Sequence, residues 1–158
     1  MGNGPSQFVV TPVAVVRSPR GALEDDRWGD VEARIVLTAP FGPEVWRGLE
    51  AFSHVEVVFV FDQVDPASVC TTSRRPRGRA DWPEVGIFAQ RAKDRPNRIG
   101  VSVCELVEVE DRSLRVRGLD AVDGTPVVDV KPYFAEFGPR GPVRQPPWAT
   151  ELMTAYYG

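Results

Sequence analysis

The sequence predicts a mainly β fold, a small antiparallel or mixed β-barrel with short peripheral helices. Short segments rich in valine and phenylalanine recur along the chain, and few segments show helical periodicity. The 14 glycines and 15 prolines are scattered between these segments as turns, with no concentration into one linker. About six strands without intervening helices favour a barrel. The length, 158 residues, suits a single domain.

Each expected strand is bounded by proline, glycine or polar residues. The expected strands cover residues 8–17, 31–38, 53–61, 101–110, 114–118 and 126–130. The clearest alternation is in 101–110, where Val101, Val103, Val107 and Val109 share one face and Ser102, Cys104, Glu108 and Glu110 share the other. A turn at 111–113 predicts that this segment forms a hairpin with 114–118. Residues 42–52 and 148–157 are the two segments with a helical pattern.

The composition excludes several classes of function. Cys70, Cys104 and a lone His54 cannot supply a typical zinc site, so no metal is expected. No apolar run approaches the roughly 18 residues that cross a bilayer, and residues 1–7 lack a secretory pattern, so we expect a cytoplasmic protein without membrane contact. The net charge of -3 is not that of a strongly basic domain, but basic residues gather between 74 and 98 and predict a locally positive surface.

Common catalytic signatures are missing from the sequence. It contains no glycine-rich dinucleotide turn, no phosphate-binding loop and no nucleophile elbow. A serine triad would need His54, which lies inside an apolar strand. Three clusters of polar residues lie next to strand ends instead. Asp62 and Gln63 close an apolar run, which is also typical of a simple strand exit.

The segment RAKDRPNRIGVSVC, residues 91–104, has two interpretations. Arg91 and Arg95 are spaced to hold a carboxylate or phosphate with two hydrogen bonds each, and Asn97 and Gly100 permit tight turns. The alternative is a solvated basic loop. Residues 119–133 form a third polar cluster, in which the turn at 123–124 is typical of a hairpin. A hairpin does not explain why Asp129 and Lys131 return within the next apolar segment.

Three motifs resemble those of a known family. FAQRAKDRPNRIGVSV (88–103), LDAVDGTPVVDVKPY (119–133) and GLEAFSHVEVVFVF (48–61) closely resemble the markers of the TsaA-like family, whose characterised members are TrmO-type tRNA methyltransferases. The resemblance covers about residues 8–135 and leaves 136–158 as a C-terminal extension with a terminal helix. It implies a small β-barrel, usually a homodimer, that binds S-adenosylmethionine and methylates N6 of a threonylcarbamoyl-modified adenosine beside the tRNA anticodon.

The resemblance also implies a set of cofactor residues. They are Asp62, Gln63, Arg91, Val101, Val122, Asp123, Gly124, Thr125 and Pro126, with Asp26, Arg27 and Trp28 near the position of an N-terminal cofactor motif. Arg91 can pair with the carboxylate of the methionyl tail, and Val101 can cover the adenine face. A base that assists the exocyclic amine could be Asp62, Asp129 or Tyr133, and the sequence does not choose among them.

The methyl acceptor has less support than the methyl donor. Residues 73–79, SRRPRGR, could lie along a phosphate backbone or form a solvated loop. The expected substrate-binding residues are Arg74, Arg75, Arg77, Arg95, Asn97, Arg98 and Lys131. Besides tRNA, the acceptor could be a small molecule or a modified amino acid. A third possibility is a module that binds the methyl donor without catalysis.

Overall fold

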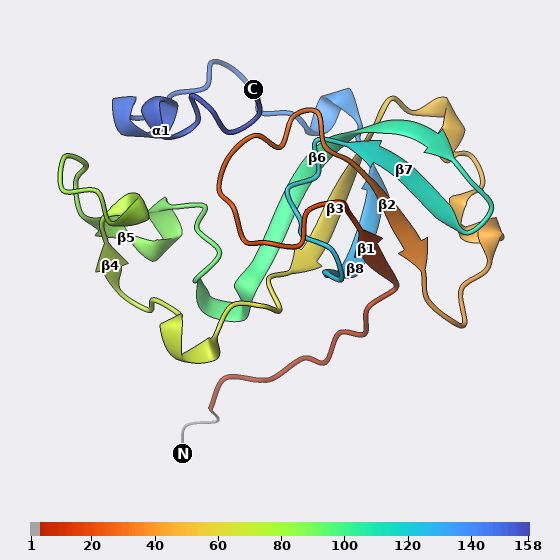
Figure 1. Ribbon diagram of the computed structural model, residues 1–158, viewed down its shortest axis with the longest axis horizontal. Helices are drawn as coiled ribbons and strands as arrows, with labels where there is room; N and C mark the ends of the chain where they lie inside the picture. The colour runs from red at the N-terminus through yellow and green to blue at the C-terminus, as the bar shows by residue number, and fades with distance from the viewer. Residues whose placement is uncertain (1–3) are drawn as a thin grey trace.

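Six antiparallel strands close into a barrel in the computed structural model, which describes residues 4–158. The strands follow one another around the barrel in the order β1-β2-β7-β6-β3-β8 (Figure 1). They are β1 (Ala14–Arg17), β2 (Glu32–Leu37), β3 (His54–Val60), β6 (Ile99–Val109), β7 (Ser113–Arg117) and β8 (Pro126–Pro132). The expected mainly β barrel is confirmed, and all its pairings are antiparallel.

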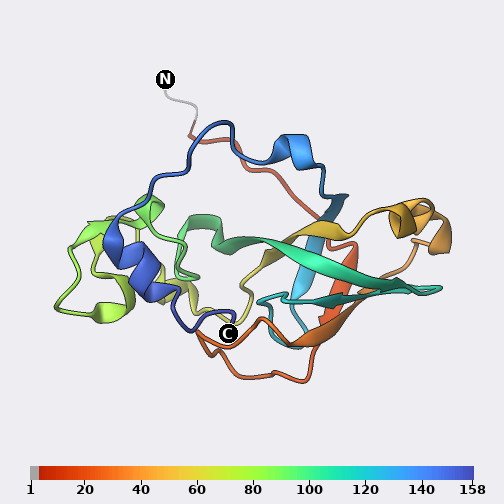
Figure 2. The same cartoon turned by 90° about the horizontal axis from the view of Figure 1, so that it is seen from above.

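A small lobe lies beside the barrel. It holds the two-stranded sheet of β4 (Ser73–Arg74) and β5 (Val85–Gly86), which no sequence pattern predicted. The single α-helix of the described residues, α1 (Pro147–Leu152), lies next to this lobe in both views (Figures 1 and 2). Seven 3-10 turns complete the structure: Pro43–Trp46, Leu49–Ala51, Pro66–Ser68, Pro76–Gly78, Ile87–Ala89, Pro96–Arg98 and Ala135–Phe137. Within residues 4–158, no helix has the length and apolar character that crossing a membrane requires.

Three expected elements differ from the structure. The strand expected over 8–17 begins only at Ala14, because Phe8 and Val9 are 88% and 95% exposed and have no sheet to join. The helix expected over 42–52 is two 3-10 turns, separated at Gly48, whose φ of 94° interrupts helical geometry. The terminal helix ends at Leu152 and gives way to turns.

The hairpin between 101–110 and 114–118 is confirmed as β6 and β7, but the alternation in β6 is not continuous. Gly100, Ser102 and Cys104 are buried, whereas Val101 and Val103 are 37% and 42% exposed. A register shift between Leu106 and Glu108 then reverses the faces, so that Val109 packs against the core. The valines of this strand therefore do not form one buried face.

The turn expected at 123–124 is present, but the hairpin that was one interpretation of it does not form. Gly124 has a φ of 84°, as the turn requires, but β8 pairs with β1 and β3 and not with β7. Large apolar side chains, Phe59, Ile35, Leu114 and Val16 among them, fill the barrel and are at most 1% exposed. Because the interior is packed, a ligand site must lie beside the barrel and not within it.

Candidate functional site

A cleft of about 900 Å³ lies between the barrel and the lobe. Five parts of the chain line it: the N-terminal loop around 23–28, the end of β3 through 63, the lobe and its exit through 95, the start of β6 with the turn before β8, and the C-terminal segment from 148. Its volume is within the range of small-molecule sites. Several loops that are distant in sequence must therefore meet to form this cleft.

The cleft brings together most of the expected cofactor residues. Asp62, Gln63, Arg91, Val101, Val122, Thr125 and Trp28 line it, as do Arg74, Arg75, Arg77 and Arg95 from the expected substrate set. Asp26, Arg27, Asp123, Gly124, Pro126, Asn97, Arg98, Asp129, Lys131 and Tyr133 do not line it. The motifs thus converge on one site. The second half of the motif 119–133, from Pro126 onwards, does not line it.

The turn at 123–124 is anchored to the end of β1. The Asp123 carboxylate accepts a hydrogen bond from the Ser18 backbone N–H at 3.0 Å, and the Gly124 N–H donates to the Val16 carbonyl at 2.8 Å. These bonds fix the adjacent Val122 and Thr125, which are 6% and 3% exposed and form part of the cleft wall. In this structure Asp123 therefore does not line the cleft itself, but fixes the backbone of the neighbouring residues that do.

Arg91 lies at the mouth of the cleft beside β6. Its Nη2 donates to the Val101 carbonyl at 2.9 Å, and it forms no ion pair within residues 4–158. Asn97 and Arg98, which follow it, have φ values of 64° and 50°, so the predicted tight turn is present at Asn97. Gly100 instead lies within β6, packed against the Phe59 ring. The Arg98 guanidinium donates to the Val64 carbonyl at 2.8 Å and holds this turn to the end of β3.

The basic side chains of the lobe face acidic partners. Arg77 binds the Asp26 carboxylate through two hydrogen bonds of 2.9 and 3.2 Å, and Lys93 lies 3.6 Å from Asp25. Arg74 pairs with Asp94 at 2.8 Å. The carboxylates of the N-terminal loop thus bind basic side chains of the lobe that could otherwise bind a phosphate. Two further arginines have backbone partners, because Arg75 donates to the Trp82 carbonyl and Arg95 donates to the Gln90 carbonyl.

The C-terminal segment forms one wall of the cleft, which the sequence analysis did not anticipate. The backbone N–H groups of Arg27 and Trp28 donate to the carbonyls of Ala155 and Tyr156 at 2.9 and 2.8 Å. Trp82 Nε1 of the lobe donates to Glu151 at 2.8 Å. The one available signal was the aromatic content of 148–157, which by itself indicates only a buried helix face.

Asp120 connects this wall to the barrel. Its carboxylate accepts hydrogen bonds from the hydroxyls of Ser102 on β6 and Tyr156 in the C-terminal segment. Burial, followed by the negative charge of Asp120, raises the pKa of the Tyr156 hydroxyl well above its usual range. The same two causes raise the pKa of the Cys104 thiol to about 12. Both groups are therefore protonated at neutral pH.

Asp129 and Lys131 lie on β8 and Tyr133 directly follows it, and none of the three lines the cleft. Asp129 and Lys131 form an ion pair at 2.7 Å, and the hydrogen bond that Lys131 donates to the Asp129 carboxylate raises the pKa of Lys131. The backbone N–H of Tyr133 donates to the His54 carbonyl at 3.0 Å. The return of Asp129 and Lys131 in this motif is thus explained by a pair on the barrel strand.

Comparison with known families agrees with the three motifs. Residues 18–138 match the family described as the tRNA-methyltransferase O N-terminal domain. The chain belongs to this family. Among curated members of the TrmO family, the tRNA (adenine(37)-N6)-methyltransferase of Escherichia coli strain K12 is 47% identical, over 83% of this chain and 60% of its own length. A probable S-adenosyl-L-methionine-binding protein of Methanothermobacter thermautotrophicus is 37% identical, over 84% of this chain and 94% of its own.

Solved structures support the same assignment. TrmO from Pseudomonas aeruginosa superposes with a TM-score of 0.72 and 32% sequence identity, over 88% of this chain and 61% of that one. The chain thus spans about 60% of the length of the Escherichia coli relative and 61% of the Pseudomonas structure. The structural likeness extends to nearly the whole of this chain, which includes the barrel that the TrmO family shares.

Proposed function

We propose that this chain is an S-adenosylmethionine-dependent methyltransferase that acts on N6 of a threonylcarbamoyl-modified adenosine beside the anticodon of tRNA. The observation that carries the proposal is the convergence of Asp62, Arg91, Val101, Val122 and Thr125 on one cleft. Arg91 and Val101 come from one motif, Val122 and Thr125 come from a second, and Asp62 directly follows the third. The Escherichia coli relative is named for the same reaction at adenine 37.

The cleft residues fit the methyl donor chemically. Arg91 has free donors for a carboxylate, while Phe59, Val101 and Val122 provide apolar contact for an adenine ring. The buried Thr125 lies next to the turn whose backbone is fixed by Asp123. When bound, the donor would supply an electrophilic methyl group, and positioning within the cleft would supply much of the rate. Trp28 closes the far side, and the Arg20 guanidinium lies 3.7 Å over its ring.

The acceptor side has features suited to RNA. Arg74, Arg75 and Arg77 stand along one wall, and Phe88 at the rim is 79% exposed. An exposed aromatic ring beside basic groups is the combination by which proteins hold unstacked bases. Binding of tRNA would require phosphates to replace carboxylates at pairs such as Arg77 and Asp26. A tRNA substrate is consistent with the cytoplasmic location that the sequence predicts.

We assign proton removal from the acceptor amine to Asp62. Of the three residues expected for this role, Asp62 alone lines the cleft, where it is exposed beside the end of β3. Asp129 is held by Lys131. Asp62→Asn should lower kcat with little change in KM for the methyl donor, whereas Asp129→Asn should leave kcat unchanged. A normal kcat for Asp62→Asn would remove this assignment.

Transfer of labelled methyl groups tests the function directly. The protein is incubated with labelled S-adenosylmethionine and separately with bulk tRNA and the low-molecular-weight fraction of an extract. We expect label in tRNA and binding of tRNA that weakens steeply with salt, because neutralised phosphates release counterions. Label confined to the small-molecule fraction would mean a different acceptor. Binding of the donor with no transfer to either fraction would mean a binding module.

The cofactor site has its own test. Arg91→Ala should weaken binding of S-adenosylmethionine more than tenfold, about 1.4 kcal/mol, because it removes the donors expected to hold the tail carboxylate. Arg79→Ala is the matched control, since Arg79 belongs to the lobe but pairs with Asp81 and does not line the cleft. Equal calorimetric affinity for both variants and the unchanged protein would exclude Arg91 from the site.

We also propose that the chain works as a homodimer. An exposed apolar strip on β6 consists of Ile99, Val101 and Val103, which are 44%, 37% and 42% exposed, and its first two residues also line the cleft. Val103→Glu should shift the sedimentation coefficient from dimer to monomer if this strip is the interface. A protein that sediments as a monomer without any substitution would end this proposal.

A further inference from the structure

The acidic residues around the cleft differ in whether they have a cationic partner. Glu24 pairs with Arg20, Asp25 with Lys93, and Asp94 with Arg74, at 2.8, 3.6 and 2.8 Å. Within residues 4–158, Asp120, Asp62 and Glu84 line the cleft without an ion pair. Asp62 and Glu84 are exposed on the rim, where water can solvate them. Asp120 is the half-buried one of the three.

Hydroxyl donors hold the Asp120 carboxylate in place. Ser102 donates to Oδ1 and Tyr156 donates to Oδ2. Ser102 is only 7% exposed, and Tyr156 belongs to the segment that closes the cleft. A carboxylate has about four lone-pair sites, so these two hydroxyls leave Asp120 with further capacity to accept. The cleft therefore contains a fixed negative charge without a local counter-charge.

A positive charge, that of Arg91, lies in the same cleft as Asp120. Asp120 raises the pKa of Tyr156 and Tyr157, after burial, and the positive charge of Arg91 lowers both. The two tyrosines thus lie within the fields of both charges. Arg91 and Asp120 do not pair with each other, and Arg91 bonds instead to the Val101 carbonyl at 2.9 Å. Two separated, opposite charges in one cleft suit a ligand that carries both signs.

We propose that Asp120 is the counter-anion for the cationic methionyl end of S-adenosylmethionine, and that Arg91 binds the carboxylate of the same methionyl group. The inference rests on the proposed function and adds a residue that the family motifs did not assign to the cofactor. A cation that enters a partly buried site loses hydration, so a fixed carboxylate offsets that cost. The cation is either the sulfonium or the α-ammonium, which lie on the same end of the donor.

If Asp120 contacts the sulfonium, the site would bind the methyl donor more tightly than the product. Once the sulfur–methyl bond has broken and its electron pair stays on sulfur, the remaining thioether is neutral. Asp120 would then hold the donor more tightly than S-adenosylhomocysteine and would favour release of the product. If the α-ammonium is the partner, both ligands would bind through Asp120 alike, because both retain this group.

Asp120→Asn tests the proposal, because it keeps the shape and removes the charge. Calorimetry compares S-adenosylmethionine, S-adenosylhomocysteine and 5′-methylthioadenosine, which carries neither the sulfonium nor the ammonium. We expect at least a tenfold loss for S-adenosylmethionine and no loss for methylthioadenosine. A loss for S-adenosylhomocysteine as well assigns the ammonium, and its absence assigns the sulfonium. An equal loss for all three ligands, or none for S-adenosylmethionine, overturns the proposal.

Two control variants separate charge from structure. Glu84→Gln removes a negative charge from the rim of the same cleft and should leave all three affinities unchanged. Tyr156→Phe removes one donor to Asp120 but keeps its charge, and should preserve the preference for S-adenosylmethionine over methylthioadenosine. If the unchanged protein binds none of the three ligands, the proposed function itself fails. If it binds them and Asp120→Asn binds them equally well, only the Asp120 inference fails.

Discussion

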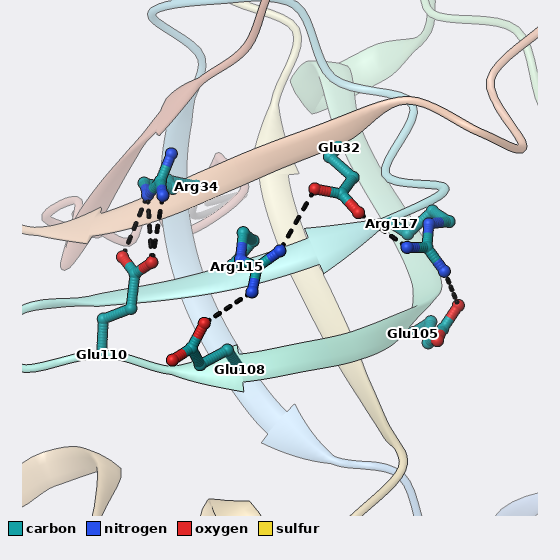
Figure 3. Close-up of polar contacts among 7 residues, drawn as sticks. All are labelled: Glu32, Arg34, Glu105, Glu108, Glu110, Arg115 and Arg117. Atoms are coloured by element: carbon teal, nitrogen blue, oxygen red, sulfur yellow. Dashed lines mark hydrogen bonds and ion pairs between the residues drawn. The ribbon is translucent and has the colours of Figure 1, made fainter.

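The two halves of strand β6 differ in whether the charged side chains beside them have partners of opposite charge. Beside the C-terminal half, glutamates and arginines of β6, β7 and β2 form ion pairs on the outer face of the barrel (Figure 3). This network consists of a chain through Glu108, Arg115, Glu32, Arg117 and Glu105 and of a separate pair between Arg34 and Glu110. Arg115 and Arg117 each bind two carboxylates, so each positive charge there is shared between strands.

The N-terminal half of β6 lacks this matching. Residues 99–102 line the cleft, where Ser102 binds an Asp120 that has no cationic partner in the described chain. The register shift between Leu106 and Glu108 lies within the C-terminal half, between Glu105 and Glu108 of the network. One strand can thus combine two kinds of surface. Ion pairs along one half support the strand register, and a carboxylate without a cationic partner beside the other half can bind a ligand.

The largest expected effect is a difference between the alkylation rates of the two cysteines. Cys104 points into the barrel at the boundary between the halves, and burial raises the pKa of its thiol from 9.0 to about 12. At about pH 8 we expect alkylation of Cys104 to be at least about 100-fold slower than that of the half-exposed Cys70, because the thiolate is the nucleophile. Mass spectrometry of the labelled peptides measures both rates. Fast labelling of Cys104 would mean that the inner face of this half is open.

Close packing at Gly100 gives the next largest effect. A Cβ at this position would lie 2.5 and 2.6 Å from two atoms of the Phe59 ring, which is 1% exposed. Gly100→Ala should therefore lower the free energy of unfolding by about 1–3 kcal/mol and weaken binding in the cleft that Phe59 lines. Gly86→Ala on β5 is the control, because nothing lies within 4 Å of its added methyl. Chemical denaturation that gives equal values for both would contradict this packing.

The ion-pair network should give the smallest effect, visible in acid. Hydrogen bonds from Arg117 and from Arg34 lower the pKa of Glu32 and Glu110, respectively, below the ordinary value of 4.5. A carboxyl whose pKa is lower in the folded state stabilises it above the unfolded pKa, and this contribution is lost as pH falls through the folded pKa. We expect the difference in Tm between the unchanged protein and Glu110→Gln to shrink between about pH 6 and about pH 3. Glu84→Gln, which removes no ion pair, should show no such trend.

The sequence predicted the barrel better than its irregular parts. Strands β2, β3 and β7 coincide closely with expected segments because their β-branched and alternating apolar residues suit a half-buried strand. β4 and β5 have two residues each and leave no periodic signal. The helix expected over 42–52 fails because Gly48 takes a φ of 94°, which periodicity does not reveal. The bulge in β6 equally depends on pairing with β7.

Motifs located much of the candidate site, but not all of its walls. Arg91, Val101 and Thr125 were named from short segments and lie together in the cleft. Tyr156 was not, because its hydrogen-bond partner Asp120 is 36 residues away and belongs to another motif. Asp129 and Lys131 were grouped with the site by proximity in sequence, although β8 carries them along the barrel and outside the residues that line the cleft.

The sequence by itself determined the alternation that makes a barrel and the motifs that assign the family. Both are local properties, because side-chain period and motif spacing are set within a few residues. Only the tertiary structure decided which charges are matched. Arg77 meets Asp26 across 51 residues, while Asp120 meets only hydroxyls. Electrostatic pairing depends on distances between atoms that the folded chain alone brings together, and this is what separates a stabilising surface from a binding cleft.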